Sequence, residues 1–250
     1  MNTDSDEIDT AKPSRLLGGR QRFANDLRES GAYWYFSATT FTLLRALLPL
    51  VREFCSGRVL DAGAGGLHGR RLLEPYSCEY VSVDIADTGQ HGELDLIADV
   101  QDLTAIDDMQ FDCVYCSQVL EHIPRPDSAL REFFRVLKPG GYVLVSAPHL
   151  SALHEEPHDY YRYTQHGLRY QLESSGFEVV KMCSAGGLMT FIAHPFSYVL
   201  NSVFWRLPVI RWLFWLINLI VLVLPPSALD HLLCTNRKWP TNIIAVGRKP

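Results

Sequence analysis

The stretch VLDAGAGG, residues 59–66, decides which fold we expect. Val59 and Leu60 belong to a short apolar strand, and glycines follow at positions 63, 65 and 66. Glycines placed directly after a first strand let the backbone turn sharply and approach a ligand closely. The stretch therefore predicts a strand, then a ligand-binding loop at a strand-to-helix turn.

The rest of the chain alternates between strand-like and helix-like segments. Apolar runs typical of strands recur at 58–62, 79–87, 94–103, 111–123, 142–148, 177–182 and 242–249, and helical patterns at 37–55, 126–141 and 164–177. Strands that alternate with helices predict a parallel sheet covered by helices on both faces. Ligands bind such sheets at the carboxyl ends of the strands.

Acidic residues stand at three successive strand ends. Asp61 precedes the first glycine by two positions, and no phosphate-binding Lys or Ser/Thr pattern accompanies the loop. A carboxylate disfavours a pyrophosphate but attracts S-adenosylmethionine, which carries an ammonium and a sulfonium and no phosphate. Asp84 ends the second strand and follows the glycine loop at the spacing at which an acid reaches ribose hydroxyls. Asp99 follows the third strand, where a carboxylate could accept from an adenine amino group. An NAD site remains the alternative, disfavoured by Asp61.

Six segments in this order resemble the class I S-adenosylmethionine-dependent methyltransferases, and among them the type 11 group: VLDAGAGG, VSVDI, ADVQDL, FDCVYCSQVLEHI, FFRVLKPGG and NIIAVGRK. The resemblance implies a doubly wound, seven-stranded Rossmann-like α/β sheet whose last strand is antiparallel, with S-adenosylmethionine as cofactor. It further implies that Asp61, Gly63 and Gly65 line the methionine end with Ser117 nearby, Asp84 with Ile85 the ribose, and Asp99 with Val100 the adenine. Leu67 stands where the family often has a third glycine.

Composition narrows the partners and the compartment. The formal net charge is −5 and no long basic run occurs, which disfavours nucleic acid. The acidic start lacks the pattern of a signal peptide, so we expect a flexible tail over 1–32 and a cytoplasmic protein. Cys113 and Cys116, three apart on a strand, should face opposite sides and serve no redox or zinc site.

Two stretches are candidates for the acceptor side. The first is Glu121-His122 after the fourth strand, a pair that the family shares and that can also be structural. The second is the loop 148–164 after the fifth strand, where type 11 relatives, some acting on bacterial surface glycans, have a similar P-x-D-Y-Y-R-Y-T run. Its candidate acceptor contacts are His154, His158, Asp159, Tyr161 and Arg162.

Either histidine of that loop is suited to act as a base, because imidazole titrates nearest neutral pH. The alternative is that the tyrosines simply pack the loop onto the sheet. His154 to His158 also match the zinc-protease pattern H-E-x-x-H, but Pro157 disfavours the helix that this site needs. We therefore expect no metal ligands.

The domain expected over 33–182 and 242–250 is interrupted by an apolar insertion, 183–241, which contains RWLFWLINLIVLVLPP at 211–226. Its two ends join neighbouring strands, so a single membrane crossing is excluded. The sixteen residues between Pro208 and Pro225 are shorter than the roughly 20 that a spanning helix needs. Three interpretations remain: a membrane-interface element, a homodimer interface and a buried cap. In the first, the headgroup-level residues are Trp205, Arg206, Arg211, Trp212 and Trp215.

The sequence thus predicts a methyltransferase that acts on a small-molecule or lipid-linked acceptor, glycan or quinone-like, with peripheral membrane contact. Two alternatives stay open. One is a non-catalytic, S-adenosylmethionine-binding assembly subunit. The other is a soluble small-molecule methyltransferase whose apolar insertion seals its pocket.

Overall fold

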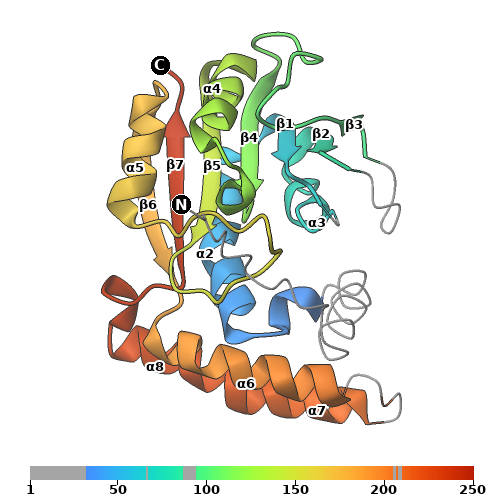
Figure 1. The fold of residues 1–250 in the computed structure, drawn as a ribbon, viewed down its shortest axis with the longest axis vertical. Helices are drawn as coiled ribbons and strands as arrows, with labels where there is room; N and C mark the ends of the chain where they lie inside the picture. Colours follow the sequence, from blue (N-terminus) through green and yellow to red (C-terminus); the bar gives the residue numbers. More distant parts are fainter. Residues whose placement is uncertain (1–31, 66, 87–93, 205–206, 208–209) are drawn as a thin grey trace, which may run out of the picture.

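The computed structural model describes residues 32–65, 67–86, 94–204, 207 and 210–250. The tail expected over 1–32 therefore lies, up to residue 31, outside the described residues, and so do Trp205 and Arg206. The described chain forms one seven-stranded sheet with helices on both faces and a further helical layer at one end (Figure 1). The strands are β1 (Gly57–Ala62), β2 (Ser77–Asp84), β3 (Leu96–Ile97), β4 (Phe111–Ser117), β5 (Leu137–Pro148), β6 (Glu178–Ala185) and β7 (Asn242–Arg248).

The strand order is β3-β2-β1-β4-β5-β7-β6. β1 pairs in parallel with both β2 and β4, while β7 runs antiparallel to its neighbours β5 and β6. The predicted fold class, with its antiparallel last strand, is confirmed. The chain runs from β1 through β2 to β3 on one side of β1, and then crosses to β4 on the other side. Sheets of this kind bind ligands in the crevice at such a switch point, which here lies between the carboxyl ends of β1 and β4.

Two hydrophobic cores lie on the two faces of the sheet. On one face pack α2 (Ala38–Phe54) and α3 (Arg70–Leu73), and on the other α4 (Pro126–Val136) and α5 (Gln165–Ser174). Cys113 belongs to the first core and Cys116 to the second, as the alternation along β4 requires. Two of these helices begin at the capping residue that the sequence indicates, since the hydroxyl of Ser37 caps α2 and that of Thr164 caps α5.

The insertion between β6 and β7 is helical. It comprises α6 (Leu188–Phe204), α7 (Arg211–Asn218), the π-helical segment η3 (Leu219–Val223), α8 (Leu224–Leu232) and the short η4 (Thr235–Arg237). α7, η3 and α8 form one continuous helix of 22 residues, which by length and composition alone is able to span a membrane. The expected sixteen-residue length was wrong, because Pro225 and Pro226 lie in the first turn of α8, where a missing amide is tolerated.

This helical layer lies beyond the carboxyl ends of the parallel strands. Figure 1 shows α6, α7 and α8 running across the base of the sheet, with α6 following directly from the end of β6. Ala185 at the end of β6 pairs with Asn242 at the start of β7, so both ends of the insertion leave the sheet side by side. The loop 149–164, which leaves the end of β5, lies between the sheet and this layer (Figure 1).

Candidate functional site

The glycine loop folds tightly because its residues approach their neighbours closely. The amides of Gly63 and Ala64 both donate to the carbonyl of Val83, which ties the loop to the end of β2. Gly63 has φ +79°, and a Cβ at this position would overlap the side chain of Val119. Leu67, in the position of the missing third glycine, adopts φ +56°, so the loop keeps a left-handed turn there despite the side chain.

Asp84 shapes a cradle beside this loop. One carboxylate oxygen accepts from the amide of Gly65 and the other from that of Ile85, each at 2.7 Å. Among the described residues, a Cβ added at Gly65 would meet the Asp84 carboxylate at 3.9 Å and the Gly63 carbonyl at 4.0 Å and nothing closer. Open space therefore adjoins a carboxylate that retains lone pairs, which suits a ligand presenting hydroxyl donors. Ile85 is exposed next to it.

Asp61 ends β1 and is 3 % exposed. Its Oδ2 accepts a hydrogen bond of 2.7 Å from the Tyr80 hydroxyl, and Gly69 has no side chain because a Cβ there would overlap the same carboxylate. Burial is the main reason that the pKa of Asp61 rises from 3.8 to about 7; the Tyr80 hydrogen bond opposes the rise and the nearby Asp84 adds to it. A cation brought close to Asp61 would favour its charged form.

The adenine-side and methionine-side candidates also lie at the carboxyl edge. Asp99 follows β3 and accepts from the amide of Gln101 at 2.9 Å, while Val100 is buried against the core. Ser117 ends β4, and its hydroxyl bonds that of Ser146 on β5 at 2.7 Å. With Asp61 and Asp84, these positions end or follow β1 to β4, which are four adjacent parallel strands, so the structure brings the predicted cofactor residues to one edge of the sheet.

Gln118 is a residue of this edge that sequence reasoning missed. It has φ +58°, a conformation that non-glycine residues rarely adopt, directly after Ser117. Its side-chain amide donates to the Ser146 hydroxyl at 3.1 Å, and its backbone amide donates to the Ser146 carbonyl at 2.9 Å. No sequence pattern marks the conformation. Backbone strain of this kind clusters at functional sites.

The cofactor edge fits the group that the resemblance implies. It combines a glycine loop with open space, the Asp84 carboxylate with free lone pairs and the negative potential of Asp61 and Asp84. No basic side chain hydrogen-bonds to either carboxylate within the described ranges. A ligand with ribose hydroxyls and a positive charge suits this chemistry, whereas a pyrophosphate would meet two carboxylates.

Two of the acceptor candidates are used to fold their own loop. Arg162 donates from Nη1 and Nη2 to the two oxygens of Asp159 at 2.6 and 2.7 Å. Arg162 also donates to the carbonyl of Ala152, and Asp159 accepts from the amide of His154. Arg162 holds the pKa of Asp159 down at about 2. This bidentate pair closes the loop and fixes the backbone of His154.

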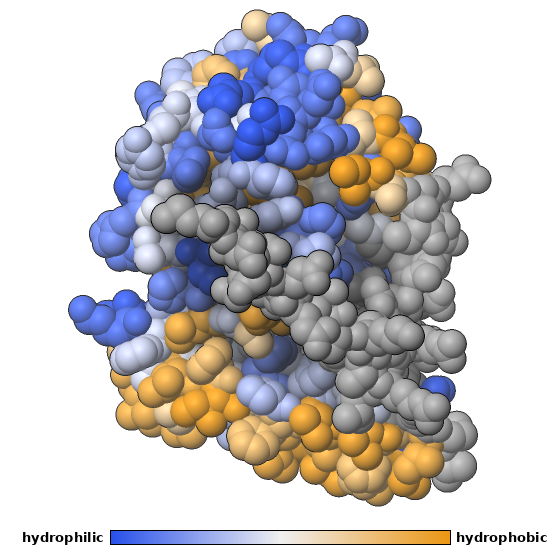
Figure 2. Space-filling view, in the orientation of Figure 1, coloured by the Kyte–Doolittle hydropathy of each residue, from blue (hydrophilic) through white to orange (hydrophobic). Residues whose placement is uncertain are grey.

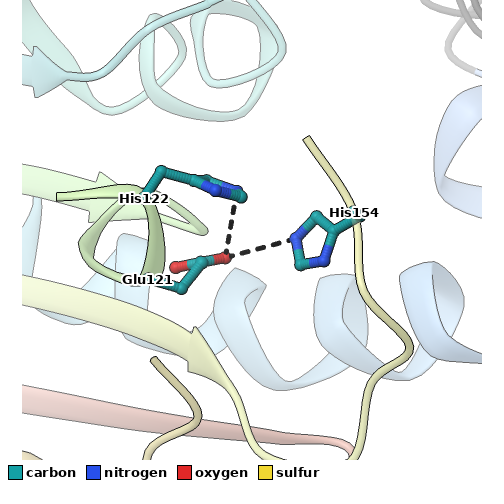
Figure 3. Close-up of side chains that lie close together, drawn as sticks. All are labelled: Glu121, His122 and His154. Atoms are coloured by element: carbon teal, nitrogen blue, oxygen red, sulfur yellow. Dashed lines mark ion pairs between the residues drawn. The ribbon is translucent and has the colours of Figure 1, made fainter. Parts of the chain in front are cut away.

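The remaining loop candidates point to different places. Tyr161 is 39 % exposed and donates its hydroxyl to the carbonyl of Pro124 at 2.9 Å, which anchors the loop to the segment after η2 (Leu120–His122). His158 is exposed, with Nδ1 3.1 Å from the Tyr160 hydroxyl. The side chain of His154 meets those of Glu121 and His122, which follow the carboxyl end of β4 (Figure 3).

Glu121 is fully buried in η2 and lies between the two histidines. Its Oε1 is 3.8 Å from Nε2 of His122 and 3.8 Å from Nε2 of His154 (Figure 3). Glu121 is the main reason that the pKa of His154 is raised, and Asp159 adds to the effect. The first acceptor stretch, Glu121-His122, and the second, the loop of His154, therefore form one cluster.

Comparison with known proteins identifies the domain type. Residues 60–145 match the family model described as a methyltransferase domain. The ubiquinone biosynthesis O-methyltransferase of Xanthomonas oryzae pv. oryzae is 31% identical over 121 residues, which cover 41% of this chain and 51% of that protein. The chain thus spans about half the length of such curated relatives.

Solved structures share the fold across most of the chain. A SAM-dependent methyltransferase from Archaeoglobus fulgidus has a TM-score of 0.55 and 19% identity, covering 92% of this chain and 99% of the other. The 1,6-didemethyltoxoflavin-N1-methyltransferase of Burkholderia thailandensis, solved with its substrate and S-adenosylhomocysteine, has a TM-score of 0.53 and 16% identity, covering 96% and 91%. At these identities the likeness establishes the fold alone.

Proposed function

We propose that this chain, whose residues 60–145 match the family model of a methyltransferase domain, transfers a methyl group from S-adenosylmethionine to a small-molecule acceptor. The observation that carries the proposal is the carboxyl edge itself. Asp61, Asp84 and Asp99 end or follow three neighbouring strands there, beside a glycine loop with open space. The assignment of these residues to methionine, ribose and adenine forms part of the proposal.

The roles follow from the local chemistry. Asp84 accepts from the ribose hydroxyls with the lone pairs left free by Gly65 and Ile85. Asp61 supplies negative potential for the ammonium and sulfonium, and Asp99 accepts from the adenine amino group. The cofactor supplies the activated methyl group when bound, so the chain has to align an acceptor with it at the tip of β4.

Calorimetry tests the cofactor. S-adenosylhomocysteine should bind the purified chain at one site, and NAD should show no binding at the same concentrations. Asp84→Ala should weaken the S-adenosylhomocysteine affinity, while the matched variant Asp108→Ala, at an exposed carboxylate away from the carboxyl edge, should not. Tight binding of NAD, or equal affinity in both variants, contradicts the cofactor assignment.

The acceptor is proposed to reach the site from a membrane. The helical layer of the insertion turns its polar residues inward. The buried ones in α6 include Thr190, Ser197 and Asn201, and those in the continuous helix of α7, η3 and α8 are Asn218, Ser227 and Asp230. The exposed large apolar residues of the layer include Phe191, Ile192, Phe196, Val199, Val203, Leu213, Leu216, Ile217, Ile220, Val221, Leu224 and Leu229. Figure 2 shows this apolar surface along the base of the molecule. This is the reverse of the arrangement that water favours.

The inward polar groups hold the layer onto the rest of the protein. Asn201 and Asn218, from the two antiparallel helices, both donate to the carbonyl of Phe36, which precedes α2. Asp230 accepts from the amides of Met189 and Thr190 at 2.8 Å each and so caps the start of α6. The apolar face therefore remains available on the outside of a firmly bonded layer.

We propose that a lipid surface, and not a second copy of the chain, covers the exposed apolar face of this layer. The layer follows directly from the carboxyl end of β6, on the side of the sheet where the acceptor binds. A bilayer covering this face would place an apolar acceptor beside the site. Trp212 and Trp239, which are half exposed, suit the headgroup level, where tryptophan is enriched. Lipid-linked glycans and quinone-like molecules are acceptors of this kind.

Cosedimentation with vesicles tests the membrane contact. The wild type should pellet with vesicles, because each buried Leu or Ile contributes about 1.5–3 kcal/mol. Leu213→Asp with Ile220→Asp should release the protein into the supernatant. The matched control, Met109→Asp with Tyr170→Asp, adds the same charge at exposed apolar positions outside the layer and should still pellet. A wild type that stays in the supernatant as a dimer, and becomes monomeric in the first variant, would instead identify the face as a subunit interface.

A further inference from the structure

Three Lewis-basic atoms converge at the end of β4. They are one carboxylate oxygen of Glu121 and a ring nitrogen each of His122 and His154, and all lie within 4.8 Å of one another. Two of the residues come from η2 and the third from the loop after β5 (Figure 3). They are placed together by backbone hydrogen bonds, since the carbonyl of Glu121 accepts from the amide of Tyr160 at 2.8 Å.

Both imidazoles are oriented by their other nitrogen. Nδ1 of His122 is 2.6 Å from the carbonyl oxygen of His158, and Nδ1 of His154 is 3.2 Å from that of Ala152. A carbonyl only accepts, so in each ring Nδ1 carries the hydrogen. In the neutral rings Nε2 is then an unprotonated lone pair, and both Nε2 atoms face Glu121. Histidine ligands of metals are oriented in this way, through a hydrogen bond from the second nitrogen.

The carboxylate of Glu121 is the unpaired member of the cluster. It is fully buried, and neither oxygen has a hydrogen-bond partner among the described residues. A buried carboxylate is costly unless a charge or a donor compensates it. The Nε2 lone pairs of His122 and His154 lie 3.8 Å from one of its oxygens and also suit a positive partner. One cation between the three atoms would satisfy all of them.

We propose that Glu121, His122 and His154 bind a divalent transition-metal ion that holds the acceptor's oxygen beside the methyl donor. Two imidazoles and a carboxylate suit Zn²⁺, Mn²⁺, Fe²⁺ or Co²⁺ better than Mg²⁺ or Ca²⁺, which prefer oxygen ligands alone. Metal–ligand bonds of about 2.0–2.2 Å require ligand atoms roughly 3.3–3.5 Å apart. The 3.8 Å from Glu121 to each histidine, and the separation of up to 4.8 Å between the two histidine nitrogens, would close by side-chain rotations. Three protein ligands leave coordination positions open for substrate.

The acceptor role rests on the proposed methyltransferase function, whereas metal binding does not. An acceptor hydroxyl coordinated at this place loses its proton to water more readily, since the metal stabilises the alkoxide or phenolate. The oxygen then forms the new C–O bond while the methyl–sulfur bond breaks, and S-adenosylhomocysteine leaves uncharged. Ser117 ends β4, the strand that Glu121 and His122 follow, and the methionine end of the cofactor is proposed to lie near Ser117.

Metal titration of the full chain tests the site. After treatment with a chelator, the wild type should bind one Co²⁺ or Zn²⁺ per chain in calorimetry, and bound Co²⁺ should show the visible absorption of nitrogen ligation. Glu121→Gln, which keeps the size of the side chain, and His154→Ala should each weaken this binding by about 100-fold or more. The control His166→Ala removes an exposed histidine of α5 and should bind as the wild type does.

Two results would overturn the metal site. One is a chelator-treated wild type that binds neither Co²⁺ nor Zn²⁺. In that case a proton shared by Glu121 and the histidines, and not a metal ion, compensates the carboxylate. The other is undiminished binding in Glu121→Gln and His154→Ala. If these variants fail to fold, the wild-type titration and the Co²⁺ spectrum still decide the question. S-adenosylhomocysteine affinity, measured in the metal-free protein, separates failure of this site from failure of the proposed function.

Discussion

Raising the pH from about 5 to about 8 should destabilise the protein through Asp61. Its carboxyl is buried, and the pKa of about 7 in the folded chain exceeds the ordinary value of 3.8 that applies when the chain unfolds. Between these two values the folded state binds a proton that the unfolded state has lost. Stability from this group is therefore fully present below the unfolded pKa and is lost as the pH rises through the folded pKa.

The magnitude follows from the two pKa values. Integrated from about pH 5 to about pH 8, the linkage relation yields a loss of about 2.5 kcal/mol in the free energy of unfolding. For a chain of 250 residues this corresponds to a fall of roughly 5–10 °C in Tm. Desolvation is the dominant cause, so the prediction tests whether the Asp61 side chain is as deeply buried as the structure shows.

Urea unfolding at several pH values measures the effect, with Asp61→Asn as the reference. Asparagine keeps an oxygen that accepts from the Tyr80 hydroxyl but does not titrate. The difference in unfolding free energy between the two proteins cancels the other titrating groups and should change by about 2.5 kcal/mol across this range. Parallel stability curves for the two proteins would refute the reasoning.

Two further predictions concern single residues. Asp84→Ala should weaken S-adenosylhomocysteine binding by about 1.5–3 kcal/mol in calorimetry, because charge-assisted hydrogen bonds to the ribose are lost; unchanged affinity would remove the ribose assignment. Lys249→Met should lower the free energy of unfolding in urea by about 1–3 kcal/mol, because the buried Lys249 donates to the carbonyls of Phe134 and Leu137 at 2.6 and 2.7 Å. The same variant should leave S-adenosylhomocysteine affinity unchanged, and a loss of affinity would link this distant contact to the site.

The sequence by itself determined the order of the main strands and helices along the chain and the position of the glycine loop at the end of β1. These features are encoded locally. Apolar runs and glycines report on the residues that carry them, and an acid directly after a strand is placed at the sheet edge by the strand's own direction. Asp61, Asp84 and Asp99 could therefore be chosen as candidates without knowing which strands pair. The antiparallel seventh strand came from the family resemblance.

The ends of the helices and the contacts of individual side chains were harder to predict from the sequence. The prolines at 225 and 226 suggested the end of an apolar segment, but the helix continues through them because η3 and the first turn of α8 absorb the missing amides. Asp159 and Arg162 were predicted as acceptor contacts from their place in the loop after the fifth strand, and that remains a prediction. Their bidentate pairing with each other depends on a loop conformation that no spacing rule specifies.

Only the tertiary structure decided that Glu121, His122 and His154 form one cluster, and that the insertion turns its polar side inward. Glu121 and His154 come from segments far apart in the sequence, and they meet because the loop 149–164 bonds to η2 through the carbonyl of Glu121. Likewise, Asn201 and Asn218 face inward because both bond to Phe36. Such contacts depend on how whole elements pack and on which carbonyls they leave available, whereas sequence patterns report on one element at a time.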